Sequence, residues 1–276
     1  PEIIIHMAAQ PLVRASYINP LETFETNIMG TINIFEAVLE LENKPIILNV
    51  TSDKCYSNNG KTQGYVETDL LGGSDPYSAS KGCAEIITDS YYRSFFSKAE
   101  IGLASARSGN VIGGSDWSVD RLLPDAIKSL KKNGRITIRN PHHVRPWQHV
   151  LEALSGYMSL CEKLAMNPKK YSGAWNFGPE LKSGITVLDL VEKIKSLWAG
   201  EVEINILDKP DFSEAEVLNL NCNKSQSLLG WFPNWDIDKS IRETIEWYKH
   251  ATSDKNMLKF SQEQIRVYEN DQFYKK

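Results

Sequence analysis

A tyrosine and a lysine four positions apart are the residues of this chain best suited to acid–base chemistry. They are Tyr77 and Lys81, within the stretch Asp75-Pro-Tyr-Ser-Ala-Ser-Lys81. If this stretch opens a helix, the two side chains lie one turn apart on the same face. The ammonium group then lowers the pKa of the Tyr77 phenol, so that the phenol can exchange a proton near neutral pH. Because the spacing also arises by chance, it predicts a site only together with its surroundings.

Those surroundings are polar clusters that follow predicted buried strands. Short apolar strands are predicted within residues 1–6, 45–51 and 101–107. They are followed by polar or small residues: His6 to Gln10 after the first strand, Thr51, Ser52, Asp53 and Lys54 after the second, and Ser108, Gly109 and Asn110 after the third. Apolar strands that alternate with helices indicate a parallel sheet covered on both faces, and such sheets bind ligands at the carboxyl ends of their strands. The clusters therefore predict one site around Tyr77 and Lys81.

The helical patterns that position these clusters can also be read along the chain. Helices are predicted over 21–41 and 77–97, with a long loop at 55–76 that is typical of an active-site element. Beyond residue 112 the sequence predicts polar loops and further short elements: helices at 124–132, 151–164, 187–198 and 241–248, and strands at 136–138 and 174–178. Thr186 and Asp189 have the spacing of a helix-capping pair. The last twenty or so residues are polar, and we expect them to be peripheral.

Composition limits the class of protein. A chain of 276 residues with 41% hydrophobic residues and a formal net charge of −4 can form one large domain or two closely joined ones. Neither a basic, nucleic-acid-binding surface nor an apolar run of membrane-spanning length is present in the sequence. The four cysteines are scattered without C-x-x-C spacing, and the loop with His142 and His143 carries no paired carboxylates. We therefore expect no metal site, no disulfide framework and a reducing, cytoplasmic location.

The beginning of the chain is unusual for a dinucleotide-binding fold. Such a fold starts with a strand, a glycine-rich turn and a helix, because the glycines bring backbone N–H groups up to the pyrophosphate. Here the first strand follows Pro1 directly, and neither Gly72-Gly73 nor Gly113-Gly114 has the required spacing. We interpret the sequence as truncated, without its first βαβ segment.

Taken together, the motifs carry a family resemblance. They are His6-Met-Ala-Ala-Gln10, Thr26-Asn-Ile-Met-Gly-Thr31, Thr51-Ser-Asp-Lys54, Tyr77-Ser-Ala-Ser-Lys81, Ser108-Gly-Asn-Val-Ile112 and Arg145-Pro-Trp-Gln-His-Val150. This set resembles the extended short-chain dehydrogenase/reductases and, among them, the CDP-glucose 4,6-dehydratases. The resemblance implies a Rossmann-like doubly wound parallel sheet and a smaller α/β substrate-binding domain. It places a partial NAD-binding domain at 1–112 with a return segment at about 142–180, and a nucleotide-sugar-binding domain at 113–141 and 181–276.

The resemblance also implies a reaction, a cofactor and a set of catalytic roles. NAD oxidises the C4 position of CDP-glucose, water is lost across C5 and C6, and the hydride returns to C6, which gives CDP-4-keto-6-deoxyglucose. Tyr77, held by Lys81, removes the C4 hydroxyl proton, Ser52 binds the C4 oxygen, and Asp53 protonates the departing C6 hydroxyl. Lys54 is either the base at C5 or a cation that stabilises the developing enolate. An alternative is a nucleotide-sugar 4-epimerase of the same family, and another is a catalytically inactive fragment.

The remaining expectations concern binding. In the resemblance, Ala8, Ala9 and Asn27 face the nicotinamide half of NAD together with Tyr77 and Lys81. Asn110 positions the substrate, Arg145 and Arg121 bind its pyrophosphate, and Trp117 stacks on cytosine. For Arg121 a structural ion pair is an equal alternative, and Trp117 is alternatively a core aromatic residue. The resemblance further implies a homodimer formed through the helices predicted at 21–41 and 77–97.

Overall fold

The computed structural model describes residues 1–276 except 182, 199, 208–217, 254–255 and 275–276. Backbone contacts divide the chain into a first unit, 1–109, 154–178 and 218–232, and a second unit, 110–153, 179–217 and 233–276. Three segments group differently from the sequence-based domain boundaries: 110–112 and 142–153 belong to the second unit, and 218–232 belongs to the first. Hydrogen bonds explain why 218–232 groups with the first unit. The N–H of Tyr65 donates to the carbonyl of Asn219 at 2.8 Å, and the N–H of Asn221 donates to the carbonyl of Tyr65 at 2.9 Å.

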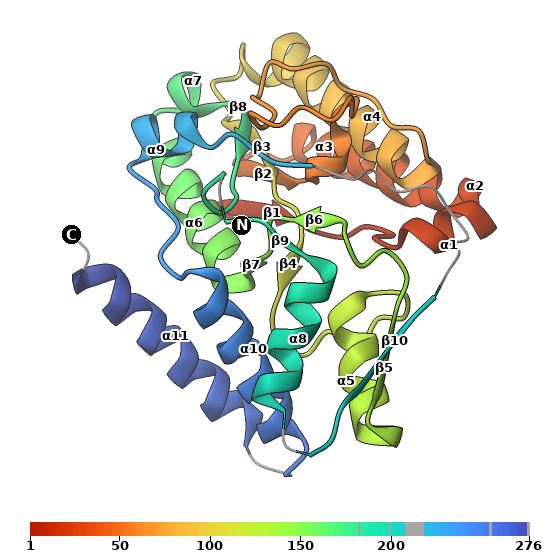
Figure 1. Ribbon diagram of the computed structural model, residues 1–276. Helices are drawn as coiled ribbons and strands as arrows, with labels where there is room; N and C mark the ends of the chain where they lie inside the picture. The colour runs from red at the N-terminus through yellow and green to blue at the C-terminus, as the bar shows by residue number, and fades with distance from the viewer. Residues whose placement is uncertain (182, 199, 208–217, 254–255, 275–276) are drawn as a thin grey trace. The chain divides into compact units, whose positions relative to one another are not determined.

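A parallel sheet forms the centre of the first unit. Its strand order is β1 (Ile3–His6), β2 (Ile46–Val50), β3 (Leu103–Arg107) and β8 (Gly173–Asn176), with all neighbours parallel (Figure 1). Every residue of β3 is buried, as expected for a strand covered on both faces. The predicted Rossmann-like α/β fold is confirmed. Because the strands are parallel, the residues that follow β1, β2 and β3 emerge at one edge of the sheet.

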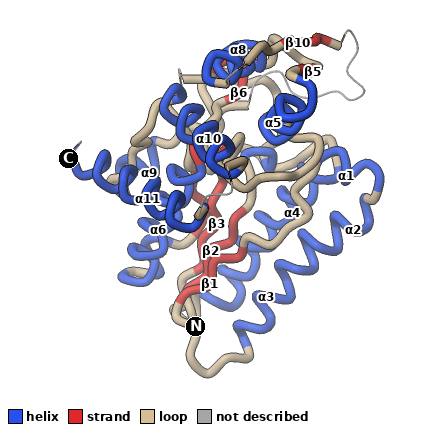
Figure 2. Tube along the Cα trace, turned by 90° about the horizontal axis from the view of Figure 1, so that it is seen from below, coloured by secondary structure: helices blue, strands red, loops and turns tan. Residues whose placement is uncertain are grey.

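Helices cover both faces of this sheet. The predicted helix at 21–41 is a continuous run of α2 (Pro20–Phe24), the π-helical η1 (Glu25–Met29) and α3 (Gly30–Leu39), preceded by α1 (Val13–Ile18). The predicted helix at 77–97 is α4 (Pro76–Tyr91) followed by the π-helical η3 (Tyr92–Phe96). Phe35 and Phe96 from these helices pack against Ile47 and Leu103 of the sheet. Figure 2 shows α3 and α4 on one side of the strands and α6 (Val150–Met166) on the other.

Local sequence signals explain where α4 begins. Asp75 is its N-cap, and the carboxylate accepts a hydrogen bond from the Ser78 N–H at 2.9 Å. Pro76 occupies the first helical position, where its missing N–H costs nothing. The helix therefore starts one residue before Tyr77, which fixes Tyr77 and Lys81 on successive turns. The unit is completed by α7 (Pro168–Tyr171) and α9 (Asn223–Leu229).

The second unit combines three short strand pairs with helices. The pairs are β4 (Val111–Ile112) with β7 (Gln148–His149), β5 (Arg135–Ile138) with β10 (Glu203–Ile206), and β6 (Val144–Arg145) with β9 (Ile185–Thr186). Its helices are α5 (Leu122–Asn133), α8 (Val187–Leu197), α10 (Ile237–Ala251) and α11 (Met257–Tyr274) (Figure 1). An apolar core joins them, with Ile127, Ile136, Val191, Ile241 and Ile245 fully buried.

The structure confirms one predicted feature of this unit and corrects another. Thr186 and Asp189 form a complete capping box at the start of α8, as predicted. The polar C-terminal segment was expected to be peripheral, but α11 is an integral helix. Tyr268 is buried, and its hydroxyl donates to the fully buried Glu152 at 2.9 Å. Within the described residues, no helix combines the length and the apolar character needed to span a membrane.

Candidate active site

The turn that follows β2 places three of the predicted catalytic residues. Residues Asp53–Cys55 form a short 3₁₀ turn, η2. The Ser52 hydroxyl accepts from the Lys54 N–H at 3.2 Å and donates to Asp53 Oδ1 at 2.9 Å. The Asp53 N–H donates to the carbonyl of Ser108, which follows the neighbouring strand β3, at 3.2 Å. Asp53 is only 3% exposed. The turn thus holds a buried carboxyl beside a hydroxyl at the carboxyl edge of the sheet.

Helix α4 brings Tyr77 and Lys81 to the same edge. Both side chains are buried, and the Lys81 ammonium donates to the carbonyl of Val50, the last residue of β2, at 3.4 Å. Burial lowers the pKa of Lys81 to about 8, although the carboxylate of Glu85 acts in the opposite direction. A proton on this ammonium is therefore held less tightly than on an ordinary lysine. The structure brings Lys81 and the Ser52–Asp53 turn together at the end of one strand.

A buried network fastens the turn after β2 to α4, and sequence reasoning missed it. Glu85, one turn beyond Lys81, accepts hydrogen bonds from the hydroxyl of Thr51, from Ser105 at 2.7 Å and from Arg107 at 2.7 Å. Arg107 and Glu85 form an ion pair whose side chains are 3% and 2% exposed. Burial alone would lower the pKa of Arg107, but the charge of Glu85 raises it above its usual value. The Glu85 carboxylate therefore links α4 to β3 and to the residue that follows β2.

Arg107 extends the network towards the loop at 55–76. Its guanidinium donates to the Tyr56 hydroxyl at 2.7 Å and to the carbonyl of Glu67 at 3.0 Å. The Tyr56 hydroxyl in turn donates to the side chain of Asn176, at the end of β8, at 2.7 Å. The long loop predicted as an active-site element is thus anchored to two strands of the sheet.

The residues predicted to face the cofactor lie beside α4. Ala8 is exposed and Ala9 half-buried, just after β1. Asn27 is buried in the π-helical turn η1. Its amide accepts from the Gln10 N–H at 2.8 Å and donates to the carbonyl of Gln10 at 3.1 Å and to Ser80 at 2.9 Å. Asn27 therefore ties the segment after β1 to α4.

The four predicted substrate-binding residues all belong to the second unit. Asn110 adopts a left-handed backbone conformation (φ 50°), which asparagine tolerates better than most residues, and its carbonyl accepts from the Gln148 N–H at 3.2 Å. Trp117 is 43% exposed and packs edge-on against Tyr248. The Arg121 guanidinium is paired with Asp116 at 2.9 Å.

Arg145 lies in the short strand β6, which pairs with β9 through Val144 and Arg145. Its guanidinium donates to the carbonyl of Val144 at 3.0 Å and lies 3.2 Å from Nδ1 of His143. These two contacts hold the guanidinium beside His143.

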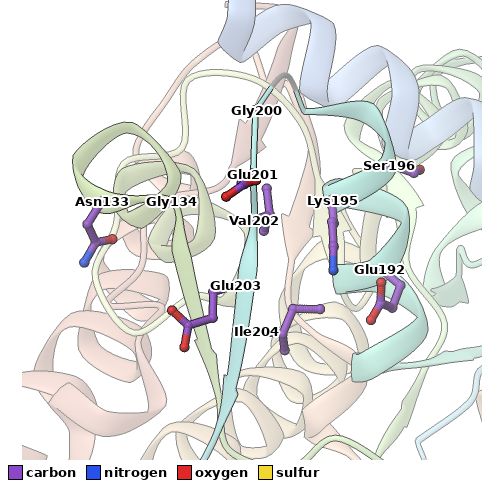
Figure 3. A pocket seen from close by; sticks show the side chains of 10 residues that line it. All are labelled: Asn133, Gly134, Glu192, Lys195, Ser196, Gly200, Glu201, Val202, Glu203 and Ile204. Atoms are coloured by element: carbon purple, nitrogen blue, oxygen red, sulfur yellow. The ribbon is translucent and has the colours of Figure 1, made fainter.

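A hollow in this unit is lined by none of the predicted site residues. Strands β5 and β10 and helix α8 line a groove of about 890 Å³ (Figure 3). Its walls are Asn133, Gly134, Glu192, Lys195, Ser196, Gly200, Glu201, Val202, Glu203 and Ile204. In the described part of the chain, no cluster of three or more histidine, cysteine or acidic side chains could hold a metal ion.

Two of the missed residues had a detectable signal in the sequence. Glu85 follows Lys81 by four positions and so shares its helix face, and Arg107 ends a predicted buried strand as its only charged residue. Tyr157, on α6, had no such signal. Burial raises its pKa to about 12; the Ser108 side chain acts in the opposite direction, and the charge of Asp53 adds a smaller increase. An electrostatic interaction between residues this distant in sequence depends on the tertiary fold.

Comparisons with known proteins show the family of this chain. Residues 1–244 match the family described as GDP-mannose 4,6 dehydratase. The CDP-glucose 4,6-dehydratase of Salmonella typhimurium is 44% identical over 273 residues, covering 97% of this chain and 76% of the relative. The resemblance predicted from the motifs is therefore confirmed.

Solved structures with low sequence identity share the fold. UDP-glucuronic acid 4-epimerase from Bacillus cereus, in complex with UDP-glucuronic acid and NAD, has a TM-score of 0.78 at 20% identity, covering 91% of this chain and 76% of the other. dTDP-glucose 4,6-dehydratase from Bacillus anthracis, in complex with NAD, has a TM-score of 0.72 at 21% identity, with coverages of 91% and 74%. At this identity the similarity shows the architecture alone. The match to the family and the 44% identical relative show more: this chain belongs to the GDP-mannose 4,6 dehydratase family of short-chain dehydrogenase/reductases.

Proposed function

We propose that this protein is an NAD-dependent nucleotide-sugar 4,6-dehydratase that converts CDP-glucose into CDP-4-keto-6-deoxyglucose. The relative that is 44% identical carries the name of this activity. The observation that carries the proposal is the buried Asp53 carboxyl, held at the same strand end as Lys81. Oxidation at C4 needs only the tyrosine–lysine pair, whereas loss of the C6 hydroxyl also needs an acid. A 4-epimerase has no use for such an acid.

Tyr77 and Lys81 act on the C4 hydroxyl. The Tyr77 phenolate accepts the hydroxyl proton, and the Lys81 ammonium one turn away stabilises the phenolate. The residues after β1 fit NAD, because Ala8 and Ala9 are small and Ala8 is exposed at the carboxyl edge of the sheet. NAD bound there would supply the two-electron acceptor for the hydride from C4 and the donor of that hydride to C6. Asn27 supports this segment by holding Gln10 against α4.

Asp53 and Lys54 act on the elimination of water. The C4 ketone makes the C5 hydrogen acidic, and Asp53 donates a proton to the departing C6 hydroxyl. The Ser52 hydroxyl orients the Asp53 carboxyl through their 2.9 Å hydrogen bond. Lys54 is half-buried and adjacent to this acid, so it removes the C5 proton or stabilises the enolate that results. Its two roles differ in the protonation state required at the start of the reaction.

We assign the nucleotide to the second unit. Arg145 is the principal ligand of the pyrophosphate, because its guanidinium fork matches phosphate oxygens and it lies in the Arg-Pro-Trp motif that carries the resemblance. Arg121 contributes less, since its charge is already paired with Asp116. Trp117 offers an exposed indole for stacking on the base, and Asn110 orients the sugar.

We also propose a homodimer formed by the two long helical runs of the first unit. Large apolar side chains stay exposed on both: Leu21 (66%) and Met29 (49%) on the first run, and Ile86 (58%) and Phe95 (48%) on the second. Exposed apolar residues on neighbouring helices are typical of an interface. Light scattering of the Ile86→Glu variant should give a monomer if this face is the interface, and an unchanged dimer would place the interface elsewhere.

The full-length protein, incubated with NAD⁺ and CDP-glucose, tests the proposed activity. Mass spectrometry should detect a product lighter than the substrate by one water. The Tyr77→Phe variant should form no product, and Asp53→Asn should form little. A product of unchanged mass with inverted C4 stereochemistry by NMR would instead identify an epimerase. Unreacted CDP-glucose would exclude this substrate, and other glucose nucleotides would then be tried.

A further inference from the structure

Gly109 contacts the carboxyl group of Asp53 more closely than any side chain would allow. A Cβ atom built on Gly109 would lie 1.9 Å from Oδ2, 2.1 Å from Cγ and 2.7 Å from Oδ1 of Asp53. All three atoms belong to the carboxyl group. Gly109 is not among the residues with a left-handed backbone, so its φ does not require glycine. The need for glycine at this position is therefore steric.

The Asp53 carboxyl is also held on its other sides. The Asp53 N–H is bonded to the carbonyl of Ser108, the residue before Gly109, and Oδ1 accepts from Ser52 at 2.9 Å. The side chain of Tyr157 lies close enough for the charge of Asp53 to add to the effect of burial on the tyrosine pKa. With Asp53 only 3% exposed, a methyl group on Gly109 would displace the carboxyl from this position rather than be absorbed by solvent.

We propose that Gly109 is a positioning residue that sets where the Asp53 carboxyl lies, and that the bare backbone at this position is required for the elimination of water. The kinetic part of the proposal rests on the proposed function. The three atoms nearest to a Cβ on Gly109 all belong to Asp53. A side chain at position 109 should therefore slow the step that uses Asp53 and spare the oxidation at C4.

A stability cycle tests the steric contact without reference to activity. The full-length wild type, Gly109→Ala, Asp53→Ala and the double variant are compared by thermal unfolding. Gly109→Ala should lower the Tm by roughly 3–10 °C, as overpacking of a buried site does. In the Asp53→Ala background the same change should have almost no effect, because all three clashing atoms are gone. An equal loss of Tm in both backgrounds would overturn the proposal.

Kinetics then test the positioning role. In a single turnover with CDP-glucose, Gly109→Ala should lower the rate of water loss about 100-fold, in the range of losing a general acid. NADH should accumulate, seen as a rise in absorbance at 340 nm, because C4 is still oxidised. The matched control is Gly178→Ala. Gly178 follows strand β8 of the same sheet, and a Cβ added there would come no closer than 3.5 Å to another atom, which is an ordinary van der Waals contact. This variant should behave as the wild type.

The outcomes separate the two proposals. A wild type that releases no water from any glucose nucleotide contradicts the proposed function, while the stability cycle still decides the contact between Gly109 and Asp53. An active wild type with a fully active Gly109→Ala variant contradicts the positioning role. The double variant Gly109→Ala/Asp53→Asn gives a further test. If Gly109 acts through Asp53, adding Gly109→Ala to Asp53→Asn should slow water loss little, because the acid is already removed. A further fall in rate by the full factor seen in the wild-type background would contradict the positioning role.

Discussion

The candidate functional residues of the two units differ in burial. In the first unit, Asp53, Lys81, Glu85 and Arg107 are each less than 10% exposed and are joined to strand ends by hydrogen bonds. In the second unit, the candidate ligands Trp117 and Arg121 lie on a loop and remain partly exposed. Reaction chemistry needs fixed geometry in a site shielded from water, whereas binding residues can remain accessible until a ligand covers them. We therefore propose that the first unit determines the reaction and the second unit determines the substrate.

The largest effect is expected for Tyr77→Phe in the first unit. Removing the phenolic oxygen eliminates the proton acceptor but preserves the ring in its buried position. We expect kcat to fall by about 10²–10⁴-fold with little change in KM. Steady-state kinetics with CDP-glucose measure both constants. A tenfold rise in KM with kcat unchanged would assign Tyr77 to binding and would remove the distinction between the two units.

The next largest effect concerns stability. Arg107→Met leaves the carboxylate of Glu85 buried without its cation, so the free energy of unfolding should fall by about 3–5 kcal/mol. The exposed pair of Arg93 and Asp89, with side chains 76% and 57% exposed, is the control. Arg93→Met should cost less than about 1 kcal/mol. Urea unfolding measures the free energy of unfolding of both variants. Equal losses would show that the buried ion pair stabilises the fold no more than the exposed one.

A pH dependence should distinguish the buried histidine of the second unit. Nδ1 of His149 accepts from the Leu151 N–H, and burial lowers the pKa of His149 from 6.5 to about 4. At a pH between about 4 and 6.5, His149 is protonated in most unfolded chains and neutral in most folded ones, so the unfolded chain binds more protons. Stability from neutral His149 is therefore complete above about pH 6.5 and is lost as the pH falls towards 4, by about 3 kcal/mol in total.

Urea unfolding at pH 7 and pH 4.5 measures this loss. The His149→Asn variant keeps an acceptor near the Leu151 N–H but cannot gain a proton in this range. The wild type should lose about 2–3 kcal/mol more than the variant between the two pH values. The carboxylates titrate in both proteins and cancel in the difference. Equal losses would show that His149 is not held neutral by burial.

The smallest effect should separate the two arginines of the second unit. Arg145→Ala should raise KM for CDP-glucose by about 10–100-fold, the range of a charge-assisted hydrogen bond, with kcat nearly unchanged. Arg121→Ala should have a smaller effect, because Asp116 already neutralises that guanidinium. If the two effects on KM were reversed in size, the assignment of the pyrophosphate ligand would pass to Arg121.

Local patterns were enough to predict most elements and the candidate residues that the structure brings to the end of β2. Strands β1, β2 and β3 and the start of α4 follow from apolar runs, from Asp75-Pro76 and from the position of polar clusters at strand ends. Contacts that join distant segments were not predictable in this way. Glu85 meets Thr51 and Arg107 only because β2 and β3 are neighbours, and Gly109 meets Asp53 for the same reason. The polar α11 was misjudged because its buried contacts, such as Tyr268 with Glu152, are few and distant in sequence.

The most direct test of the account follows the hydrogen on C4 of the substrate. CDP-glucose carrying deuterium at C4 is converted by the full-length protein with NAD⁺ in ordinary water, and NMR locates the label in the product. If the first unit performs an oxidation, an elimination assisted by Asp53 and a reduction, the deuterium must appear in the C6 methyl group. Deuterium that stays at C4 of a sugar of unchanged mass would contradict the dehydratase and identify an epimerase.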